Sequence, residues 1–232
     1  YPSVPADRKA HLARIISESY LVRGDAAKAR EYYDLSLKGT KDANTRADWF
    51  YSGSVLYATR DYKGAIENFV RMGERCDSIG QIASYNLGYS YIQVKDKVSA
   101  MGAFKEASEL KFDAAIAEDA LFNYAKLAFD LNNDISGFDD YLKKYASAGK
   151  DEQIYSYMAV AALYDHDYER AVEAYDKIDE LDKDMVQNYM KANYLRANQL
   201  VRNGSYRKAV PCLKAAAYYS PRNTRINQLS RF

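Results

Sequence analysis

The sequence predicts an all-α fold built from about six pairs of helices. Alanine, leucine, lysine, glutamate and arginine are abundant, and these residues favour helix. Glycine (11 residues) and proline (4 residues) are too scarce to mark a turn every 8 to 12 residues or so, as a β-sandwich requires. A polar turn followed by a small residue also recurs six times along the chain, which is the pattern of a repeat protein.

The period is measured from the small residue that follows each turn. Successive small residues stand 36, 35, 37, 34 and 38 positions apart, at Ala29, Ala65, Ala100, Gly137, Ala171 and Ala209. In the second unit the apolar and small residues recur at spacings of three and four, at Trp49, Gly53 and Leu56 before the turn and at Ala65, Phe69 and Met72 after it. This spacing places them on one face of each helix, so each unit is expected to be a helical hairpin.

Two residue types have a mechanical reason to stand where they do. Gly53 and Gly88 are expected where the two helices of a pair cross, because a larger side chain would hold the backbones apart. An aspartate in the turn can cap the second helix, since its carboxylate accepts a hydrogen bond from an otherwise unpaired N–H. The aspartates expected to do this are Asp25, Asp61, Asp96, Asp134 and Asp167.

These residues resemble the tetratricopeptide-repeat (TPR) family, whose signature places Trp or Leu, Gly and Tyr on the first helix and Ala, Phe and Ala on the second. The resemblance implies a right-handed α-α superhelix (TPR solenoid) of about six helix pairs and a non-catalytic role. Two units depart from the signature. Gly137 stands where alanine is usual and should weaken its helix by about 1 kcal/mol. Pro211 lies inside a predicted helix, which it should kink.

The expected organisation is a short linker, an array of repeats and a final segment. The linker covers residues 1–6 and the array covers residues 7–221, with repeats at approximately 10–41, 46–77, 81–112, 118–148, 152–183 and 190–221. Residues 222–232 place Ile226, Leu229 and Phe232 at helical spacing, so they are expected to start a further helix pair. The chain is then expected to be a fragment of a longer array that can self-associate through an uncapped C-terminal end. A lone capping helix is the alternative.

Residues of the kind that catalyse reactions do not form a recognisable motif. His11 and His166 belong to different repeats, and neither has a cysteine or histidine at metal-ligand spacing. A glycine-rich phosphate loop is absent, as are a nucleophile elbow and a zinc-protease motif. Cys76 and Cys212 fall four repeats apart and are not expected to form a disulfide. The sequence therefore predicts neither an enzyme, nor a cofactor, nor a metal site.

The resemblance places the partner-binding residues on the first helix of each pair, which lines the concave groove in this family. Carried over position by position, this groove contains Arg14, Phe50, Tyr57, Tyr85, Tyr89, Phe122, Lys126, Tyr164, Tyr194 and Asn198. Aromatic side chains in a groove suit a protein or peptide ligand, because they dominate binding hot spots. Packing of the rings against the next repeat is the structural alternative.

One TPR subclass holds a partner's C-terminal carboxylate with asparagine and lysine side chains. Asn86 and Asn123 occupy one of these positions, but the lysine and asparagine expected one unit earlier are missing. A clamp for a C-terminal carboxylate is therefore not expected.

The charge of the chain is unevenly distributed. The net charge is +1, yet residues 185–232 contain nine Lys or Arg and no Asp or Glu. Such a block could attract nucleic acid, but complementarity with the acidic neighbouring repeats is the simpler explanation, and nucleic acid is not expected as the partner. No apolar run is long enough to span a membrane.

The main hypothesis is thus a scaffold for protein–protein or protein–peptide interaction. Two alternatives remain open, a regulator whose basic end contacts nucleic acid and a glycan-binding subunit whose aromatics stack on sugars. The 23 tyrosines and the loose period resemble envelope-associated TPR arrays of Gram-negative bacteria, which implies a periplasmic or envelope location.

Overall fold

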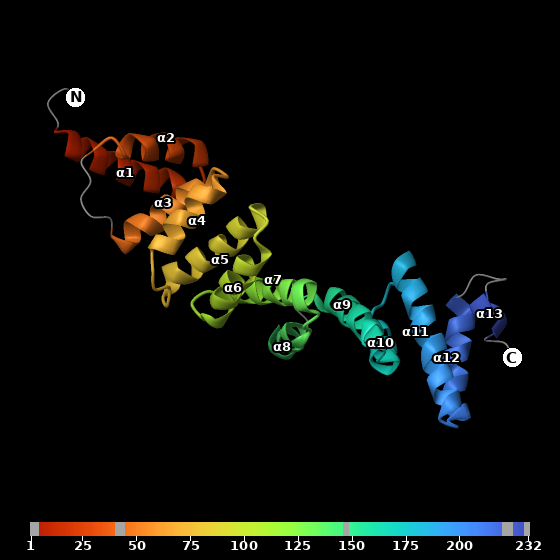
Figure 1. Cartoon of the computed structure of the whole chain (residues 1–232). Helices are drawn as coiled ribbons and strands as arrows, with labels where there is room; N and C mark the ends of the chain where they lie inside the picture. Colours follow the sequence, from red (N-terminus) through yellow and green to blue (C-terminus); the bar gives the residue numbers. More distant parts are fainter. Residues whose placement is uncertain (1–4, 40–44, 146–148, 220–224, 230–232) are drawn as a thin grey trace. The chain divides into compact units, whose positions relative to one another are not determined.

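The chain is helical throughout the parts that its computed structural model describes, residues 5–39, 45–145, 149–219 and 225–229 (Figure 1). The all-α class predicted from the sequence is confirmed. The helices are α1 (Ala6–Val22), α2 (Ala26–Ser36), α3 (Arg46–Ala58), α4 (Tyr62–Arg71), α5 (Ser78–Gln93), α6 (Lys97–Glu109), α7 (Ala114–Asn132), α8 (Ser136–Tyr145), α9 (Asp151–Tyr164), α10 (Tyr168–Tyr175), α11 (Lys183–Arg202), α12 (Tyr206–Tyr219) and α13 (Arg225–Leu229). Five pairs of successive helices pack as hairpins: α1 with α2, α3 with α4, α5 with α6, α9 with α10, and α11 with α12.

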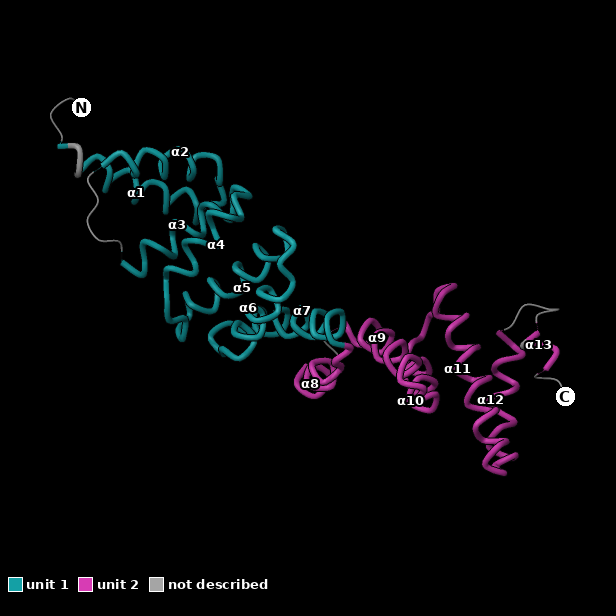
Figure 2. The backbone as a smooth tube through the Cα atoms, viewed as in Figure 1, with its two compact units in different colours: residues 1–132 teal, residues 133–232 magenta. Residues whose placement is uncertain are grey.

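The helices form two compact units, which Figure 2 shows in different colours. Unit 1 covers residues 1–132 and contains α1–α7, and unit 2 covers residues 133–232 and contains α8–α13. The division falls inside the segment predicted as the fourth repeat, since α7 belongs to unit 1 and α8 to unit 2. The repeat boundaries drawn from the sequence therefore remain a prediction.

Each of the six turns passes through one residue in the left-handed region of backbone space. These residues are Gly24 (φ 79°), Arg60 (64°), Lys95 (66°), Asn133 (54°), His166 (62°) and Gly204 (72°). In unit 1 the N–H that follows the turn residue reaches back to a carbonyl in the preceding helix, from Asp61 to Leu56 at 2.8 Å and from Asp96 to Tyr91 at 2.9 Å. These bonds close the first helix in the manner of a Schellman motif.

Five of the six left-handed residues are followed by an aspartate that caps the next helix, as predicted; Gly204 is followed by Ser205. The carboxylates of Asp25, Asp61, Asp96 and Asp167 accept the backbone N–H three residues on, at 3.0–3.2 Å, and that of Asp134 accepts the N–H of Ser136 at 2.9 Å. One turn sequence therefore ends one helix and starts the next. His166 is itself one of these turn residues, and it is exposed.

Glycines on α3 and α5 let a phenylalanine ring of the next helix approach the backbone. A Cβ atom on Gly53 would lie 2.7 Å from the ring of Phe69, and one on Gly88 would lie 2.8 Å from the ring of Phe104. Both rings are almost completely buried. The prediction that these glycines stand at the helix crossings is confirmed, and their missing side chains leave the space that the rings fill.

The core continues from one pair to the next through small residues. The six residues that define the repeat period, Ala29, Ala65, Ala100, Gly137, Ala171 and Ala209, are all buried. In unit 1 one cluster joins α3 and α4 to α5 and α6 through residues that include Leu56, Phe69 and Leu87. Trp49, the only tryptophan, packs against this cluster with the guanidinium of Arg71 5.2 Å from its ring centre.

A buried glutamine connects the third pair to α7. Gln81 has no exposed surface, and its side-chain amide donates to the carbonyls of Ala107, Leu110 and Asp113 at 2.9–3.2 Å. Its amide oxygen accepts the N–H of Asp113 at 2.7 Å. These bonds satisfy backbone groups where α6 ends and α7 begins, which water cannot reach.

The sixth hairpin contains the proline noted in the sequence. Pro211 lies inside α12, and the helix continues past it to Tyr219. Beyond that point α13 packs on α12, and the buried Asn227 donates to the Ala217 carbonyl at 2.9 Å. A helix is therefore present in the segment predicted to start a further pair. The side chain of Ile226 and the whole of Phe232 lie outside the described residues, as do residues 1–4 of the predicted linker.

Gly88→Ala tests the close approach of ring and backbone. The added Cβ would overlap the Phe104 ring, so the free energy of unfolding should fall by about 1–3 kcal/mol in urea titrations. The matched control is Gly102→Ala on α6, where no atom lies within 4 Å of the added Cβ. That variant should gain about 0.5–1 kcal/mol. Equal effects of the two substitutions would contradict the role given to Gly88.

Lys95→Gly tests the left-handed turn. A Cβ in this conformation is unfavourable, so the glycine should raise the free energy of unfolding by up to about 1 kcal/mol. Glu67→Gly, at an exposed position inside α4, should instead lower it by about 1 kcal/mol. Thermal or urea unfolding of both variants gives the comparison, and a loss of stability in Lys95→Gly would show that the lysine side chain has another role.

Candidate functional site

The first helices of successive hairpins form one side of unit 1. Helix α1 contacts α3, α3 contacts α5, and α5 contacts α7. Residues that point away from the second helices on these four elements therefore share a continuous surface, here called the first-helix face. Seven of the residues predicted to bind a partner belong to these helices: Arg14, Phe50, Tyr57, Tyr85, Tyr89, Phe122 and Lys126.

The structure gives these residues different environments. The rings of Phe50, Tyr57, Tyr85 and Tyr89 are half-buried, whereas Phe122 is only 6% exposed. The ammonium group of Lys126 lies 5.4 Å from the ring centre of Phe122. Phe122 is thus mainly a packing residue, and the first-helix face presents partly exposed tyrosines beside it.

Arg14 serves a structural contact within this face. Its guanidinium donates to the carboxylate of Asp48 on α3 and lies 3.4 Å from the carboxylate of Glu18. Asp48 also accepts the backbone N–H of Thr45 at 2.8 Å, which completes a capping box at the start of α3. The charge of Arg14 is therefore balanced by the neighbouring carboxylates.

The predicted residues of unit 2 are spread over two helices. Tyr164 ends α9 and is 75% exposed, while Tyr194 and Asn198 are half-buried on α11. Helices α9 and α11 are in contact. No hydrogen bond between these three side chains is present among the described residues.

The most organised group on the first-helix face is centred on Asp119 of α7. One carboxylate oxygen accepts the hydroxyls of Tyr85 at 2.7 Å and Tyr89 at 2.9 Å, both from α5. The same oxygen accepts the side-chain amide of Asn123 at 2.8 Å. Asp119 therefore fixes both tyrosine hydroxyls at one point. Asp119 is not among the residues predicted from the sequence to bind a partner, although it follows Tyr85 by 34 residues, about one repeat.

The two rings are also fixed by aromatic contacts. Tyr85 and Tyr89 meet edge to face with their ring centres 5.0 Å apart. Both lie against the buried Phe104, at 6.1 Å and 5.0 Å between centres. Edge-to-face contacts of this kind are favourable. Because the rings are held at both ends, this tyrosine pair is ordered before any ligand arrives.

The environment of the pair opposes ionisation of its hydroxyls. The pKa of Tyr85 and that of Tyr89 lie above the ordinary value of 10.0, mainly because burial removes the phenols from water. The negative charge of Asp119 acts in the same direction. Both residues therefore act as neutral hydrogen-bond donors rather than as acids or nucleophiles.

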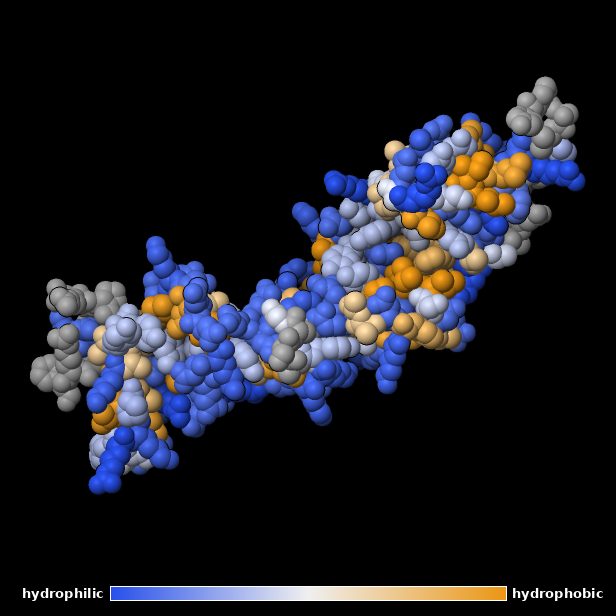
Figure 3. Space-filling view, turned by 180° about the vertical axis from the view of Figure 1, so that it is seen from behind, coloured by the Kyte–Doolittle hydropathy of each residue, from blue (hydrophilic) through white to orange (hydrophobic). Residues whose placement is uncertain are grey.

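A second surface feature is apolar and lies on the first helix pair. Leu12, Ile15 and Ile16 of α1 are exposed, and so is Leu35 of the next helix, α2. Figure 3 shows hydrophobic residues gathered at this end of unit 1. The residues that occupy the same repeat position as Leu12 on α5 and α7 are Ala83 and Ala120, and both are buried. This surface was not predicted from the sequence.

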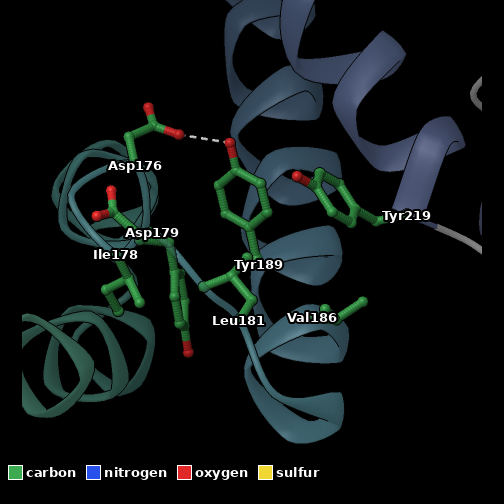
Figure 4. Close-up of a pocket in the computed structure, with 8 residues that line it drawn as sticks. Asp176, Ile178, Asp179, Leu181, Val186, Tyr189 and Tyr219 are labelled. Atoms are coloured by element: carbon green, nitrogen blue, oxygen red, sulfur yellow. Dashed lines mark hydrogen bonds between the residues drawn. The ribbon is translucent and has the colours of Figure 1, made fainter. Parts of the chain in front are cut away.

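A third feature is a pocket of about 270 Å³ within unit 2. It lies where α10 ends and α11 begins, and Figure 4 shows the side chains that line it. Its lining consists of three tyrosines, two aspartates and three aliphatic residues: Tyr175, Tyr189, Tyr219, Asp176, Asp179, Ile178, Leu181 and Val186. The groove positions transferred from the TPR resemblance do not include any of these residues.

The remaining chemistry of the described ranges is limited. No group of three His, Cys, Asp or Glu side chains converges in a way that could hold a metal ion there. Within the same ranges, no helix has the length and apolar character needed to cross a membrane. Cys76 is exposed and Cys212 is buried.

Asp119→Asn should lower the pKa of Tyr85 and of Tyr89 toward 10, because it removes the neighbouring negative charge. These phenols ionise at a lower pH in the unfolded chain than in the folded protein, so the free energy of unfolding should fall as the pH rises above about 10. In Asp119→Asn this fall should be less steep than in the parent protein. NMR of ζ-carbon-labelled tyrosine follows each titration. Asp130→Asn, on the same helix, should leave both pKa values unchanged, and an equal shift there would rule out a local effect of Asp119.

Comparison with known proteins gives little beyond the geometry. No protein-family model and no curated protein sequence matches the chain. Among solved structures the chain is similar to the TPR2AB domain of yeast Sti1 in its complex with pHSP90. The TM-score is 0.39 and the identity 16%, over 96% of this chain and 97% of that chain. The all-α fold is therefore supported by the turns, caps and core of this chain itself.

Proposed function

We propose that the chain is a non-catalytic scaffold that binds a protein or peptide segment along the first-helix face of unit 1. The observation that carries this proposal is the ordered tyrosine pair, Tyr85 and Tyr89. Both rings are partly exposed, yet their positions are fixed by Asp119 and Phe104. A ring that is already ordered loses little conformational entropy on binding, so its contact area contributes more to affinity.

The polar groups of this site favour one kind of peptide contact. The tyrosine hydroxyls donate to Asp119, so the surface they leave for a partner is mainly the aromatic rings. Aliphatic or aromatic side chains of a peptide suit such a surface. A free C-terminal carboxylate suits it poorly, because Asn123 lies 2.8 Å from the negatively charged Asp119. This agrees with the missing carboxylate-clamp residues in the sequence.

The test starts with selection of binding peptides from a random display library and continues with calorimetry on purified variants. Tyr85→Ala and Tyr89→Ala should each weaken the selected peptides about tenfold or more. Asp119→Asn should weaken them less, since the rings remain but lose one constraint. Tyr206→Ala provides the matched control, because Tyr206 is an exposed tyrosine at the start of a second helix. If the selected peptides bound equally to all four variants, the first-helix face would be excluded as their binding site.

A second candidate, contact with nucleic acid through the C-terminal helices, is favoured by one observation. Six exposed basic residues there have no ion-pair partner among the described residues: Lys191, Arg202, Arg207, Lys208, Lys214 and Arg225. Binding to random oligonucleotides that weakens steeply with salt would support this candidate, because phosphate contacts release counterions. The envelope location and the glycan-binding alternative also remain predictions from the sequence.

A further inference from the structure

The pocket of unit 2 has aromatic walls whose rings are held in place. The ring centre of Tyr189 lies 5.7 Å from that of Tyr175 and 5.3 Å from that of Tyr219, both edge to face. In Figure 4 the Tyr189 ring stands between the two aspartates and Tyr219. Its hydroxyl donates to the carboxylate of Asp176. The pocket thus combines electron-rich rings with a carboxylate at one edge.

The negative charge around the pocket is not neutralised from within the described chain. Asp176 and Asp179 line the pocket, and neither forms an ion pair with a described residue. Two basic side chains of these segments, Lys177 and Arg196, have other contacts. The ammonium of Lys177 lies 5.6 Å from the ring centre of Tyr155, and the guanidinium of Arg196 donates to Glu169. The two carboxylates therefore remain available to a positively charged ligand.

A buried tyrosine forms one wall of the pocket. Tyr175 is 1% exposed, and its buried hydroxyl lies near the side chain of Asn188 without a hydrogen bond of good geometry. Burial raises the pKa of this phenol, so it stays neutral. Tyr175 therefore contributes an uncharged aromatic surface to the pocket.

We propose that this pocket binds an ammonium or guanidinium group, as carried by a lysine or arginine side chain of a peptide or by a small organic amine. The positive charge lies against the tyrosine rings through cation–π contacts and close to the carboxylates of Asp176 and Asp179. The aliphatic stem of the ligand packs on Ile178, Leu181 and Val186. The volume of about 270 Å³ accommodates the end of one such side chain.

Other ligand classes fit these residues less well. A carboxylate or phosphate would face the charges of Asp176 and Asp179 without a basic residue in the lining. A metal ion would find two carboxylates, and no third acidic, histidine or cysteine ligand joins them among the described residues. The residues that line the pocket all belong to unit 2, so its ligand does not depend on the function proposed for the first-helix face of unit 1.

The experiment titrates the whole chain with n-butylammonium and with n-butylguanidinium, followed by NMR of labelled tyrosine. The neutral probe of similar length is n-butanol. Asp179→Asn removes a lining charge, whereas Glu180→Gln removes the adjacent charge that does not line the pocket. Both side chains are exposed, so neither substitution should disturb folding. Tyr189→Phe keeps the ring and removes only its hydroxyl.

The expected result is saturable binding of both cations, with shifts at Tyr175, Tyr189 and Tyr219, and no saturable binding of butanol. Asp179→Asn should weaken binding about fivefold or more, Glu180→Gln less than about twofold, and Tyr189→Phe should retain most of the affinity. If Asp179→Asn and Glu180→Gln lowered the affinity for the cations equally, the cations would be attracted by the overall negative charge rather than bound in the pocket, and the proposal would be overturned. The proposal would also be overturned if butanol bound with the same affinity as the two cations.

A second arm separates the two sources of the cation. It compares a blocked pentapeptide with a central lysine against the same peptide with norleucine, which has no charge. Tighter binding of the lysine peptide than of butylammonium identifies a peptide side chain as the natural ligand. Equal binding of the two identifies a small amine, and equal binding of the lysine and norleucine peptides overturns the proposal.

Discussion

The close approach of a phenylalanine ring to a glycine backbone is the constraint on which unit 1 depends. Because Gly53 and Gly88 have no side chain, Phe69 and Phe104 can lie directly against the first helix of their own pair. The same Phe104 ring packs edge to face against the rings of Tyr85 and Tyr89. A change that moved this ring would therefore alter both the hairpin and the surface that a partner meets, so packing and binding share one residue.

Besides the shared apolar core, polar contacts join neighbouring hairpins through residues about one repeat apart. Arg46 and Asp77, Arg75 and Glu106, Lys97 and Asp130, and Tyr85 and Asp119 are separated by 31, 31, 33 and 34 positions. Exposed ion pairs contribute little to stability one by one. They do require matching partners in adjacent repeats, however, and so they favour one register of hairpin against hairpin.

The sequence predicted the fold more completely than the site, for a physical reason. Left-handed turns, aspartate caps and glycine crossings are encoded locally, within a few residues of Asp61 or Gly88. The environment of Phe122, the ion pair of Arg14 with Asp48, and the pairing of Tyr85 with Asp119 depend on the rotation of one helix against the next. The pocket around Tyr189 needs three helices and a connecting segment, and no single periodicity in the sequence marks it.

The only tryptophan makes the two units separately observable. Trp49 lies on α3 under the guanidinium of Arg71, so its emission reports the environment within unit 1 alone. Circular dichroism in the far ultraviolet sums the helices of both units. When the two optical signals are followed through one denaturation, coincident curves mean that the units unfold together. Separated curves measure how much cooperativity is lost across the junction between Asn132 and Asn133.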